Sequence, residues 1–585
     1  MQSNRFVVAA AFLLATVPAQ TTRHVPAQHA TIQAAIVASA NGDTVLVAPG
    51  VYLERIDFLG KAITVRSTGG AAATTIDANQ TGTVVTFATG EGSASVLEGF
   101  TVRGGLGITA EAGGIQCSSA SPTIRRCTIT GNRGHAGSAG NPGGAGGIHA
   151  QSSTLRLLDC DVVGNFGGDG GGSATVAGGK GGAGGVYIAS GFGVGAATLE
   201  RLRVRGNRGG NGGTGVVPGP SFGRGGCGGF EFSTFSSTTV LRDCEFRGND
   251  GGVGGTGNGG VGGFDIYGPT ALFSAGVAFV NCVVVGNRGG QGGSSAVCFG
   301  GDGGGTFKNG IVVFTALHTT IAGNDGGLPV APGQVSGGIT VGGWQLSSAN
   351  LRNSILWGNT SAGGPSDLLV VGIAASANNC DIGVASTFVI GTGNLSVDPQ
   401  FVNLAAGDVH LTAASPCRHA GAVVAALPPF DFEGDPRVVG PAPDMGADEF
   451  DLLPGTREDF TLALTLNGVA DPAVTPVAGP AGVLAIKSLR SPQGTLANDF
   501  TVLLLEVWTP PVPPLPSAAY PGLQLPVTAP WFAVVPSGIG AAGATIANVV
   551  PSGLSGMAVR LQGVVVSLAA KNGSYATTAA RDVNF

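Results

Sequence analysis

Charged and aromatic residues are scarce in this chain of 585 residues, at 11% and 6% of the sequence. The formal net charge is only −6, so the chain has neither the basic surface that nucleic acids attract nor a polybasic patch for anionic membranes. The shortage of aromatic residues argues against a compact globule with a core of large side chains. Because 43% of the residues are hydrophobic, the low charge does not indicate a disordered chain.

Long apolar runs are also missing beyond the N-terminus. Phe6–Val17 is an apolar run of 12 residues after Arg5, shorter than the roughly 20 residues that span a bilayer. Small residues follow it, which is typical of a signal peptide. We therefore expect a signal peptide over 1–19 and a secreted or cell-surface protein without an integral membrane segment after signal removal. A buried N-terminal helix is the alternative interpretation.

Glycine, in contrast, is abundant, with 105 residues, and the fold must bury small and β-branched side chains while tolerating it. The pattern apolar-x-x-Cys-x-apolar-x-Gly-Asn recurs at intervals of 33 to 42 residues. Short strand-like pieces such as GGIQC and GGFEF open each repeat after a glycine pair. Units this short bury an apolar face only by stacking, so the repeats predict a solenoid. The repeated Asn occurs at Asn132, Asn165, Asn207, Asn249, Asn287, Asn324 and Asn359.

Two columns of the repeat have a structural interpretation. Asn tolerates left-handed backbone, and its amide can bond the equivalent Asn of the next coil, which predicts an asparagine ladder. The cysteine column points inward as small-residue packing. Free thiols are favoured there, although neighbouring coils about 4.8 Å apart would also allow a disulfide. The column contains Cys127, Cys160, Cys244 and Cys282.

Charged residues flank the cysteine column and alternate in sign from coil to coil. Stacked opposite charges stabilise the register of the coils, so we interpret them as exposed ladders. A further alternating column follows the asparagines, from Arg133 to Asp325. The flanking residues are also the candidates for a catalytic or calcium site, because they share one sheet face. Those candidates are Asp159, Asp161, Arg201, Arg203, Asp243 and Glu245.

The calcium interpretation is the less favoured one. Calcium needs converging carboxylates, and the arginines lie between the acidic coils. No paired Asp–Asp cluster is evident in the coils for a hydrolase, and no cofactor is expected. The histidines lack metal-ligand spacing, and His318 occupies a ladder position that predicts an exposed side chain.

Glycine-rich loops, such as 167–185 and 251–263, separate the coils. They are predicted either to stack as extended polyglycine strands or to remain mobile. A helix over 31–39 should cap the solenoid, and a less periodic segment over 391–450 should close it. Residues 451–585 differ in composition, with short apolar stretches between Pro-rich turns, and predict an all-β, sandwich-like C-terminal domain.

The opening (TIQAAI, GDTVLVAPGVYLE) and the coils (SPTIRRCTITGN) resemble bacterial members of the pectate-lyase-like superfamily of right-handed parallel β-helices. The close (NLSVDPQFVN, DPRVVG, DMGADEF) resembles the choice-of-anchor Q proteins of that group. The resemblance implies an all-β fold: a right-handed parallel β-helix over 20–450 with Gly-rich corner loops, followed by the smaller domain.

Three functions are compatible with this sequence. One is a non-catalytic structural or adhesive rod, and another is a rod that binds polysaccharide or cell-envelope components. The third is a polysaccharide lyase or hydrolase with a diverged site, as the superfamily resemblance implies. The non-catalytic interpretations are favoured, because ladder chemistry accounts for the charged residues.

Overall fold

The computed structural model describes most of residues 20–450 and the strands of 461–584. The predicted signal peptide and the turns of the last region lie outside the described residues. Between 20 and 450 the description omits 109–110, 190–195, 218, 220, 234–237, 268–273, 295–297, 309–310, 329–334, 343–347, 372–374, 387–388 and 426.

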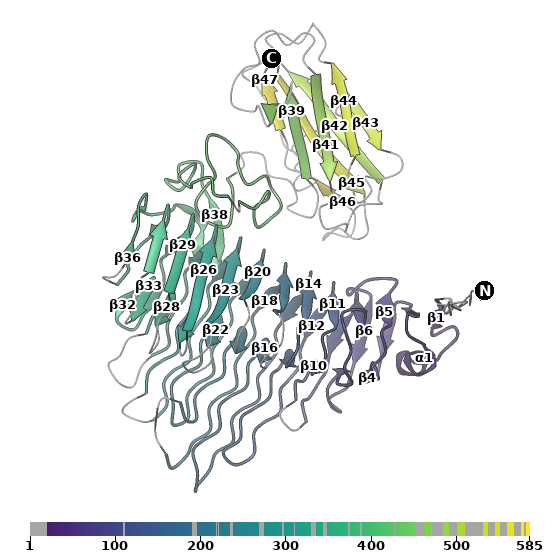
Figure 1. Cartoon of the computed structure of the whole chain (residues 1–585), viewed down its shortest axis with the longest axis vertical. Helices are drawn as coiled ribbons and strands as arrows, with labels where there is room; N and C mark the ends of the chain where they lie inside the picture. Colours follow the sequence, from purple (N-terminus) through teal and green to yellow (C-terminus); the bar gives the residue numbers. More distant parts are fainter. Residues whose placement is uncertain are drawn as a thin grey trace, which may run out of the picture.

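The described part of 20–450 is a right-handed parallel β-helix, as the repeats predict (Figure 1). Each coil contributes one short strand to each of three parallel sheets, which we name sheets A, B and C. The strands are only three or four residues long in most coils, so each coil depends on its neighbours for hydrogen bonds.

The strands of each sheet follow one another along the rod. Sheet A contains, in spatial order, β1 (Thr22–Val25), β2 (Thr44–Val47), β5 (Thr64–Ser67), β8 (Val96–Glu98), β11 (Thr123–Arg125), β14 (Arg156–Leu158), β17 (Thr198–Glu200), β20 (Thr238–Arg242), β23 (Ser274–Val280), β26 (Ile311–Leu317), β29 (Ser348–Arg352), β34 (Ala375–Asn378) and β36 (Val389–Ile390). Sheet B contains β3 (Gly50–Tyr52), β6 (Thr74–Asp77), β9 (Thr101–Arg103), β12 (Thr128–Thr130), β15 (Asp161–Val163), β18 (Arg203–Arg205), β21 (Glu245–Arg247), β24 (Val283–Val285), β27 (Thr320–Ala322), β30 (Ile355–Trp357) and β35 (Asp381–Ile382). Sheet C contains β33 (Leu368–Val371), β28 (Ile339–Gly342), β25 (Gly305–Lys308), β22 (Phe264–Tyr267), β19 (Phe230–Ser233), β16 (Val186–Ala189), β13 (Ile148–Gln151), β10 (Ile115–Ser118), β7 (Val85–Phe87) and β4 (Ile56–Asp57).

The core is a set of stacked apolar columns. Ile129 pairs in register with Val162, and Val204 with Phe246, so that equivalent residues lie directly above one another. All of these side chains are fully buried. Each buried aliphatic residue contributes about 1.5–3 kcal/mol to stability, and the columns therefore fix which coil lies on which.

The asparagine column forms a continuous hydrogen-bonded ladder. Asn132 donates its backbone N–H and its Nδ2 to Oδ1 of Asn165, at 3.1 and 3.0 Å, and this pattern repeats up to Asn359. Asp367 accepts both bonds from Asn359 and ends the ladder. The expected left-handed asparagine is wrong. The glycine before each Asn has that conformation, with φ between 57° and 66° at Gly131, Gly164, Gly206, Gly248, Gly286, Gly323 and Gly358.

The cysteine column lies inside the coils. Cys127, Cys160, Cys244 and Cys282 are at most 1% exposed, and none of the nine cysteines forms a disulfide. Each thiol donates to backbone carbonyls, as Cys244 does to Arg242 O at 3.3 Å. Thr319 and Ser354 replace cysteine in later coils and make equivalent bonds. Apart from the buried Leu202, the column therefore contains small donors that bond to the backbone rather than disulfide partners.

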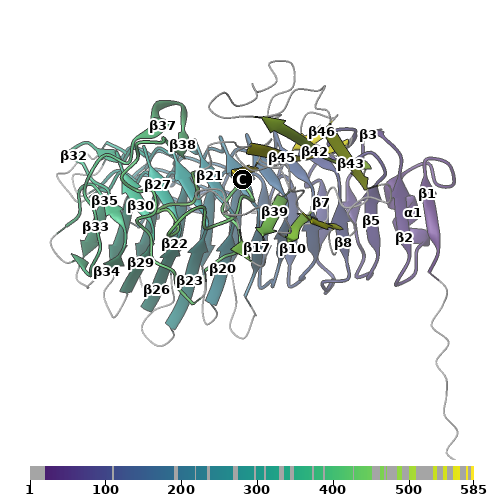
Figure 2. The same ribbon diagram turned by 90° about the horizontal axis from the view of Figure 1, so that it is seen from above.

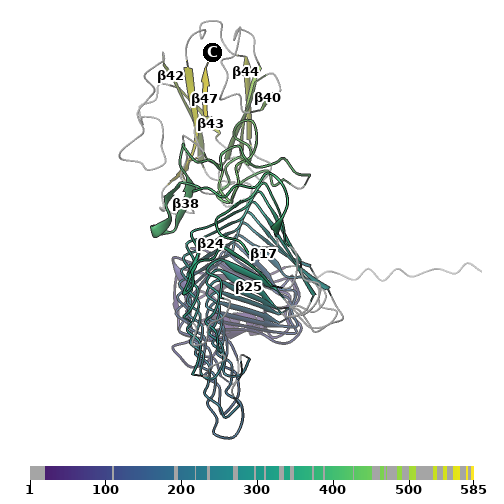
Figure 3. The same cartoon turned by 90° about the vertical axis from the view of Figure 1, so that its left-hand side faces the viewer.

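The glycine-rich loops are ordered arms that project from one side of the body (Figures 1 and 3). Gly226 N–H donates to Gly210 O, and Gly252 N–H to Gly226 O, at 2.8 and 2.9 Å, so that hydrogen bonds cross the array from arm to arm. Non-glycine residues recur every third position, as at Arg208, Asn211 and Thr214, which is the period of a polyproline II-type helix. Of the two predicted alternatives, the stacked polyglycine strands are the correct one.

The ends of the β-helix are covered by other segments. Helix α1 (Ile32–Ala38) lies at one end (Figure 2), and Glu54 accepts the backbone N–H groups of Ile32 and Gln33 at its start. Near the other end is the hairpin of β31 (Thr360–Ser361) and β32 (Gly364–Pro365). The closing segment contains β37 (Phe401–Asn403), the 3₁₀ helix η1 (Leu404–Ala406) and β38 (Asp408–Leu411), and it packs on the outer side of sheet B.

The last region contains two antiparallel sheets, in keeping with the predicted all-β character; a separate sandwich domain stays a prediction. Their strands are β39 (Thr461–Leu466), β40 (Val469–Ala470), β41 (Leu484–Arg490), β42 (Phe500–Trp508), β43 (Trp531–Val535), β44 (Ala544–Val549), β45 (Ala558–Val566), β46 (Tyr575–Thr577) and β47 (Arg581–Asn584).

Candidate functional site

The candidates predicted from the sequence occupy two neighbouring rows. Asp161, Arg203 and Glu245 stack in register on the outer side of sheet B. Asp159, Arg201 and Asp243 lie at the corner between sheets A and B, where each has a left-handed backbone with φ between 51° and 55°. The sequence pattern did not reveal these turns.

Ion pairs neutralise two of these four carboxylates, Asp159 and Glu245. Arg201 Nε lies 2.5 Å from Asp159 Oδ1. Glu245 is 3% exposed and lies between Arg205 and Arg247, with N–O distances of 2.5 Å to each. Its partners are therefore the arginines at the ends of the strands, not the stacked Arg203. Among the six candidates, no two carboxylates converge on a common cation position.

Asp243 is the most perturbed of the six. Burial raises its pKa to about 6, although Asn281 donates to it at 3.0 Å. The same Asn281 amide also donates to Phe430 O, in the closing segment. The closing segment therefore shields Asp243 from solvent, and this burial is the structural cause of its raised pKa.

The outer side of sheet C carries a row that the repeat pattern did not reveal. The second residues of consecutive strands point away from the core and stack coil on coil. Most are polar, and they are covered to different degrees. The row is Gln116, His149, Tyr187, Glu231, Asp265, Thr306 and Thr340.

The centre of this row is a group of charges and phenols, which we name the ionic cluster: Lys180, Tyr187, Arg224, Glu231, Asp265 and Tyr267. Glu231 and Asp265 are stacked on adjacent coils and are 1% and 2% exposed. Lys180 contacts Glu231, and Arg224 contacts Asp265. Each cation belongs to a glycine arm and reaches the carboxylate of the next coil.

Two tyrosines frame the lysine. The Lys180 ammonium lies 5.9 Å from the Tyr187 ring centroid and 5.7 Å from that of Tyr267, within the range of cation–π attraction. The Tyr267 hydroxyl donates to Glu231 Oε1 at 2.9 Å. The His149 ring stacks on Tyr187 with centroids 4.9 Å apart. The result is an aromatic and charged surface beside the arms.

The electrostatics of the cluster are strongly coupled. Burial lowers the pKa of Lys180, and Glu231 partly offsets this effect. Burial opposes ionisation of Glu231, but Lys180 and Arg224 outweigh it, and its pKa is lowered. A lysine with a depressed pKa in a partly exposed position is a common mark of a functional site. The arrangement can bind hydroxyl or carboxylate groups.

A sequence signal for this cluster exists. GGFEF and GGFDIY place Glu231 and Asp265 at the same position of adjacent repeats. Lys180 and Arg224 each precede the first strand residue of their coil by six positions, at Val186 and Phe230. The signal therefore lies in equivalent positions of consecutive repeats, as it does for the cysteine column.

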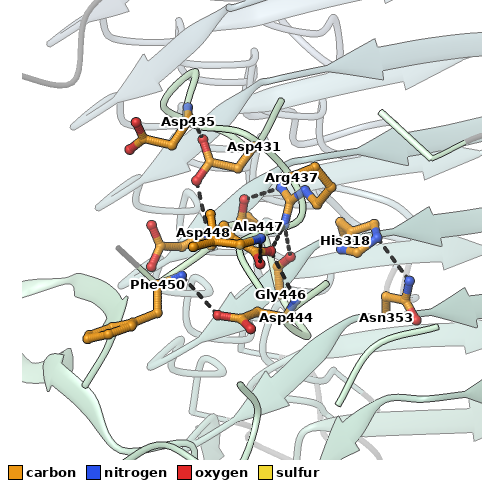
Figure 4. Close-up of polar contacts among 12 residues, drawn as sticks. His318, Asn353, Asp431, Asp435, Arg437, Asp444, Gly446, Ala447, Asp448 and Phe450 are labelled. Carbon is orange, nitrogen blue, oxygen red and sulfur yellow. Dashed lines mark hydrogen bonds and ion pairs between the residues drawn. The ribbon is translucent and has the colours of Figure 1, made fainter. Parts of the chain in front are cut away.

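A second polar group lies where the closing segment packs on sheet B (Figure 4). Arg437 is 1% exposed and donates to Asn281 Oδ1, Gly446 O and Ala447 O. Asp431, Asp444 and Glu449 accept backbone N–H groups, and burial raises the pKa of Glu449 to about 9. Because backbone amides already occupy these carboxylates, this group anchors the segment.

The predicted exposure of His318 is also wrong. The closing segment covers it, and it is fully buried with its Nε2 2.9 Å from Asn353 Nδ2. Burial, with a smaller effect of Arg437, lowers the pKa of His318 to about 2. His318 is therefore neutral and structural.

His410 belongs to a further acidic group in the closing segment. Its Nδ1 contacts Asp408, and its Nε2 lies 3.1 Å from Glu433 Oε2 and 4.0 Å from Asp448 Oδ1. One histidine and two carboxylates are suitable metal ligands, and their ligand atoms lie within 4.8 Å of one another. Each of these residues also makes a further interaction within the protein.

Comparisons with known proteins add little to this description. No family model and no curated protein matches the chain. A solved structure to which it is similar is a mutant pectin methylesterase in complex with a hexasaccharide, at 10% identity and a TM-score of 0.19, covering 64% of this chain and 81% of that one. A likeness of this size supports no argument about activity.

The parallel register of the coils itself defines the class of the molecule as a right-handed parallel β-helix protein. None of the helices in the described residues is long and apolar enough to cross a membrane.

Proposed function

We propose that this protein is an exported β-helix rod that binds polysaccharide without cleaving it, with the ionic cluster as part of the binding surface. Export rests on the signal peptide predicted for 1–19. The closing segment, whose motifs resemble the choice-of-anchor Q type, would complete the rod and belong to its attachment at the cell surface.

One observation carries the binding proposal. The side chains of Lys180 and Arg224 are 29% and 24% exposed, whereas their partners Glu231 and Asp265 are 2% exposed. The buried carboxylates thus hold two cations in place beside the tyrosine rings. Pre-positioned cations and aromatic faces suit the carboxylate, hydroxyl and apolar faces of an acidic sugar.

A polysaccharide lyase is the second candidate, and the partly exposed Lys180 and Arg224 on adjacent coils favour it. A neutral amine can remove a proton from carbon, and Arg224 could neutralise a neighbouring sugar carboxylate. In this case the two buried acids would tune the cations and would not react themselves.

Binding and turnover of uronic-acid polymers would separate the two functions. The variant K180Q/E231Q removes both charges of one pair but keeps hydrogen-bonding groups. R205Q/E245Q is the matched control, because it removes an exposed cation and a buried carboxylate from sheet B. We expect the first variant to lose at least about 10-fold in affinity and the control to keep it.

The two proposals fail differently in this experiment. Release of unsaturated product, followed by ultraviolet absorbance and abolished by K180Q/E231Q, would replace the binding function with the lyase. Affinity for no charged or neutral glycan, or an affinity that both variants leave unchanged, would contradict a binding role of the cluster.

A further inference from the structure

The residues that follow the ladder asparagines form a row along the rod, which we name the charged stripe: Arg133, Phe166, Arg208, Asp250, Arg288 and Asp325. Parallel bridges join each member to the next. The stripe is solvent-accessible: the side chains of Arg133 and Arg288 are 60% and 71% exposed, and Phe166 is 47% exposed. Within one chain Arg133 lies 4.0 Å from Asp169 and Arg288 lies 3.5 Å from Asp325, but ion pairs this exposed contribute only about 0–1 kcal/mol.

When two copies of the stripe run in opposite directions, opposite charges face each other at four of the six positions. Rotation by 180° about an axis between Arg208 and Asp250 places Arg208 opposite Asp250 of a second copy, and the reverse. The same rotation places Arg133 opposite Asp325. A parallel arrangement in register would instead put like charges together at every charged coil, so of these two in-register arrangements only the antiparallel one is attractive.

The remaining positions also fit this rotation. Phe166 would face Arg288, an aromatic ring opposite a guanidinium. A second column lies three residues further along each arm, and in it Asp169 would face Gln291. No like charges meet across the pairs formed by these two columns. A two-fold interface requires a surface that complements itself in this way.

We propose that the charged stripe is a self-association surface on which a second copy of this chain docks antiparallel. The hydrogen-bonded arms present the stripe as a rigid surface, so that binding requires no ordering of loops. The contacts are exposed charges, and salt screens them with a Debye length of about 8 Å at 0.15 M. The dimer should therefore form at low salt and dissociate as salt rises.

The exchange of Arg133 and Asp325 tests this arrangement. Five coil steps of about 4.8 Å separate them, or about 24 Å within one chain, so they cannot compensate each other there. We expect R133D and D325R each to weaken the dimer at least about 10-fold, and R133D/D325R to restore it to within about 3-fold. Sedimentation of the full chain at low salt would measure the constants, and circular dichroism would verify folding.

Each other result overturns the proposal. A chain that stays monomeric at low salt has no such interface. A dimer that the single changes leave intact uses another surface. A double variant that is as weak as the single ones shows that Arg133 and Asp325 do not meet.

Discussion

The asparagine ladder shows how single residues set the register of the rod. Asn249 accepts the backbone N–H and Nδ2 of Asn207 and donates to Val204 O at 2.9 Å. All of these groups are buried, and leaving a buried polar group unpaired costs about 1–3 kcal/mol.

We therefore expect N249A to lower the free energy of unfolding by about 2–4 kcal/mol. Asn141 is the matched control, since it is exposed and its Nδ2 bonds only Ser138 nearby. N141A should change stability by less than about 0.5 kcal/mol. Urea denaturation of both variants measures the difference, and equal effects would show that the ladder contributes no stability.

The buried thiols make a chemical prediction. Burial raises the pKa of Cys127 and Cys380 to about 12, and none of the nine cysteines forms a disulfide. The native protein should not react with a thiol reagent between pH 7 and 9, because thiolate is the reactive form. All nine should react after unfolding. Fast labelling of the folded chain would contradict a closed column.

Asp243 should make stability depend on pH. Its folded pKa is about 6, above the usual 3.8, so the folded state holds this proton more tightly than the unfolded state. Stability from this group is therefore lost as pH rises from about 4 to about 6. D243N should stabilise the protein by about 1–3 kcal/mol at pH 8 and have little effect at pH 4, as thermal unfolding at the two values would show.

Among the elements, the polyglycine arms depend on the absence of side chains. A Cβ on Gly252 would lie 1.9 Å from Gly210 O, and one on Gly290 equally close to Gly252 O. No side chain fits at this distance. The glycines of these positions allow the arms to approach until their backbones hydrogen-bond.

One matched pair of glycine-to-alanine substitutions tests the packing of the arms. We expect G252A to destabilise the protein by at least about 3 kcal/mol or to open the array, with faster amide exchange in the arms. Gly172 is in the same array, but a Cβ there meets nothing closer than 3.3 Å. G172A should leave stability and exchange unchanged. Tolerance of G252A would mean that the arms are not packed as described.

Sequence periodicity predicted the elements that repeat and missed those that depend on long-range contacts. The columns at Cys127 and Asn132 were visible because one residue type recurs in them. The Glu231–Asp265 pair was not, since its column contains six different residue types in seven coils. His318 was misplaced because the chain that covers it lies more than a hundred residues later, around Asp444 and Gly446.

For the whole molecule, the closing segment is the part that joins distant regions. Val409 and Ala447 pack on Val283, Val285 and Ala322 of sheet B. Arg437 adds a buried hydrogen bond to Asn281, 2.9 Å away. The segment thereby covers the outer side of the last coils and leaves the ionic cluster on sheet C separate from it.

R437A should release this segment. Removing this arginine leaves the buried acceptors Asn281 Oδ1, Gly446 O and Ala447 O without their donor, and each unpaired buried group costs about 1–3 kcal/mol. Limited proteolysis should then cut within 391–450 while the coils resist. R352A, at an exposed arginine, is the control and should remain uncut. Equal resistance of both variants would show that Arg437 does not anchor the segment.

The stacked register of the rod makes residues one coil apart direct neighbours. Thr130 pairs with Val163 on adjacent coils, whereas Arg205 lies one coil further along the same sheet. Adjacent coils lie about 4.8 Å apart, which suits a disulfide, and two coil steps exceed its reach of roughly 7 Å. Oxidation of T130C/V163C should therefore give a disulfide-linked peptide by mass spectrometry, and T130C/R205C should give none. A disulfide in the second variant, or its absence in a folded first variant, would contradict the stacked register.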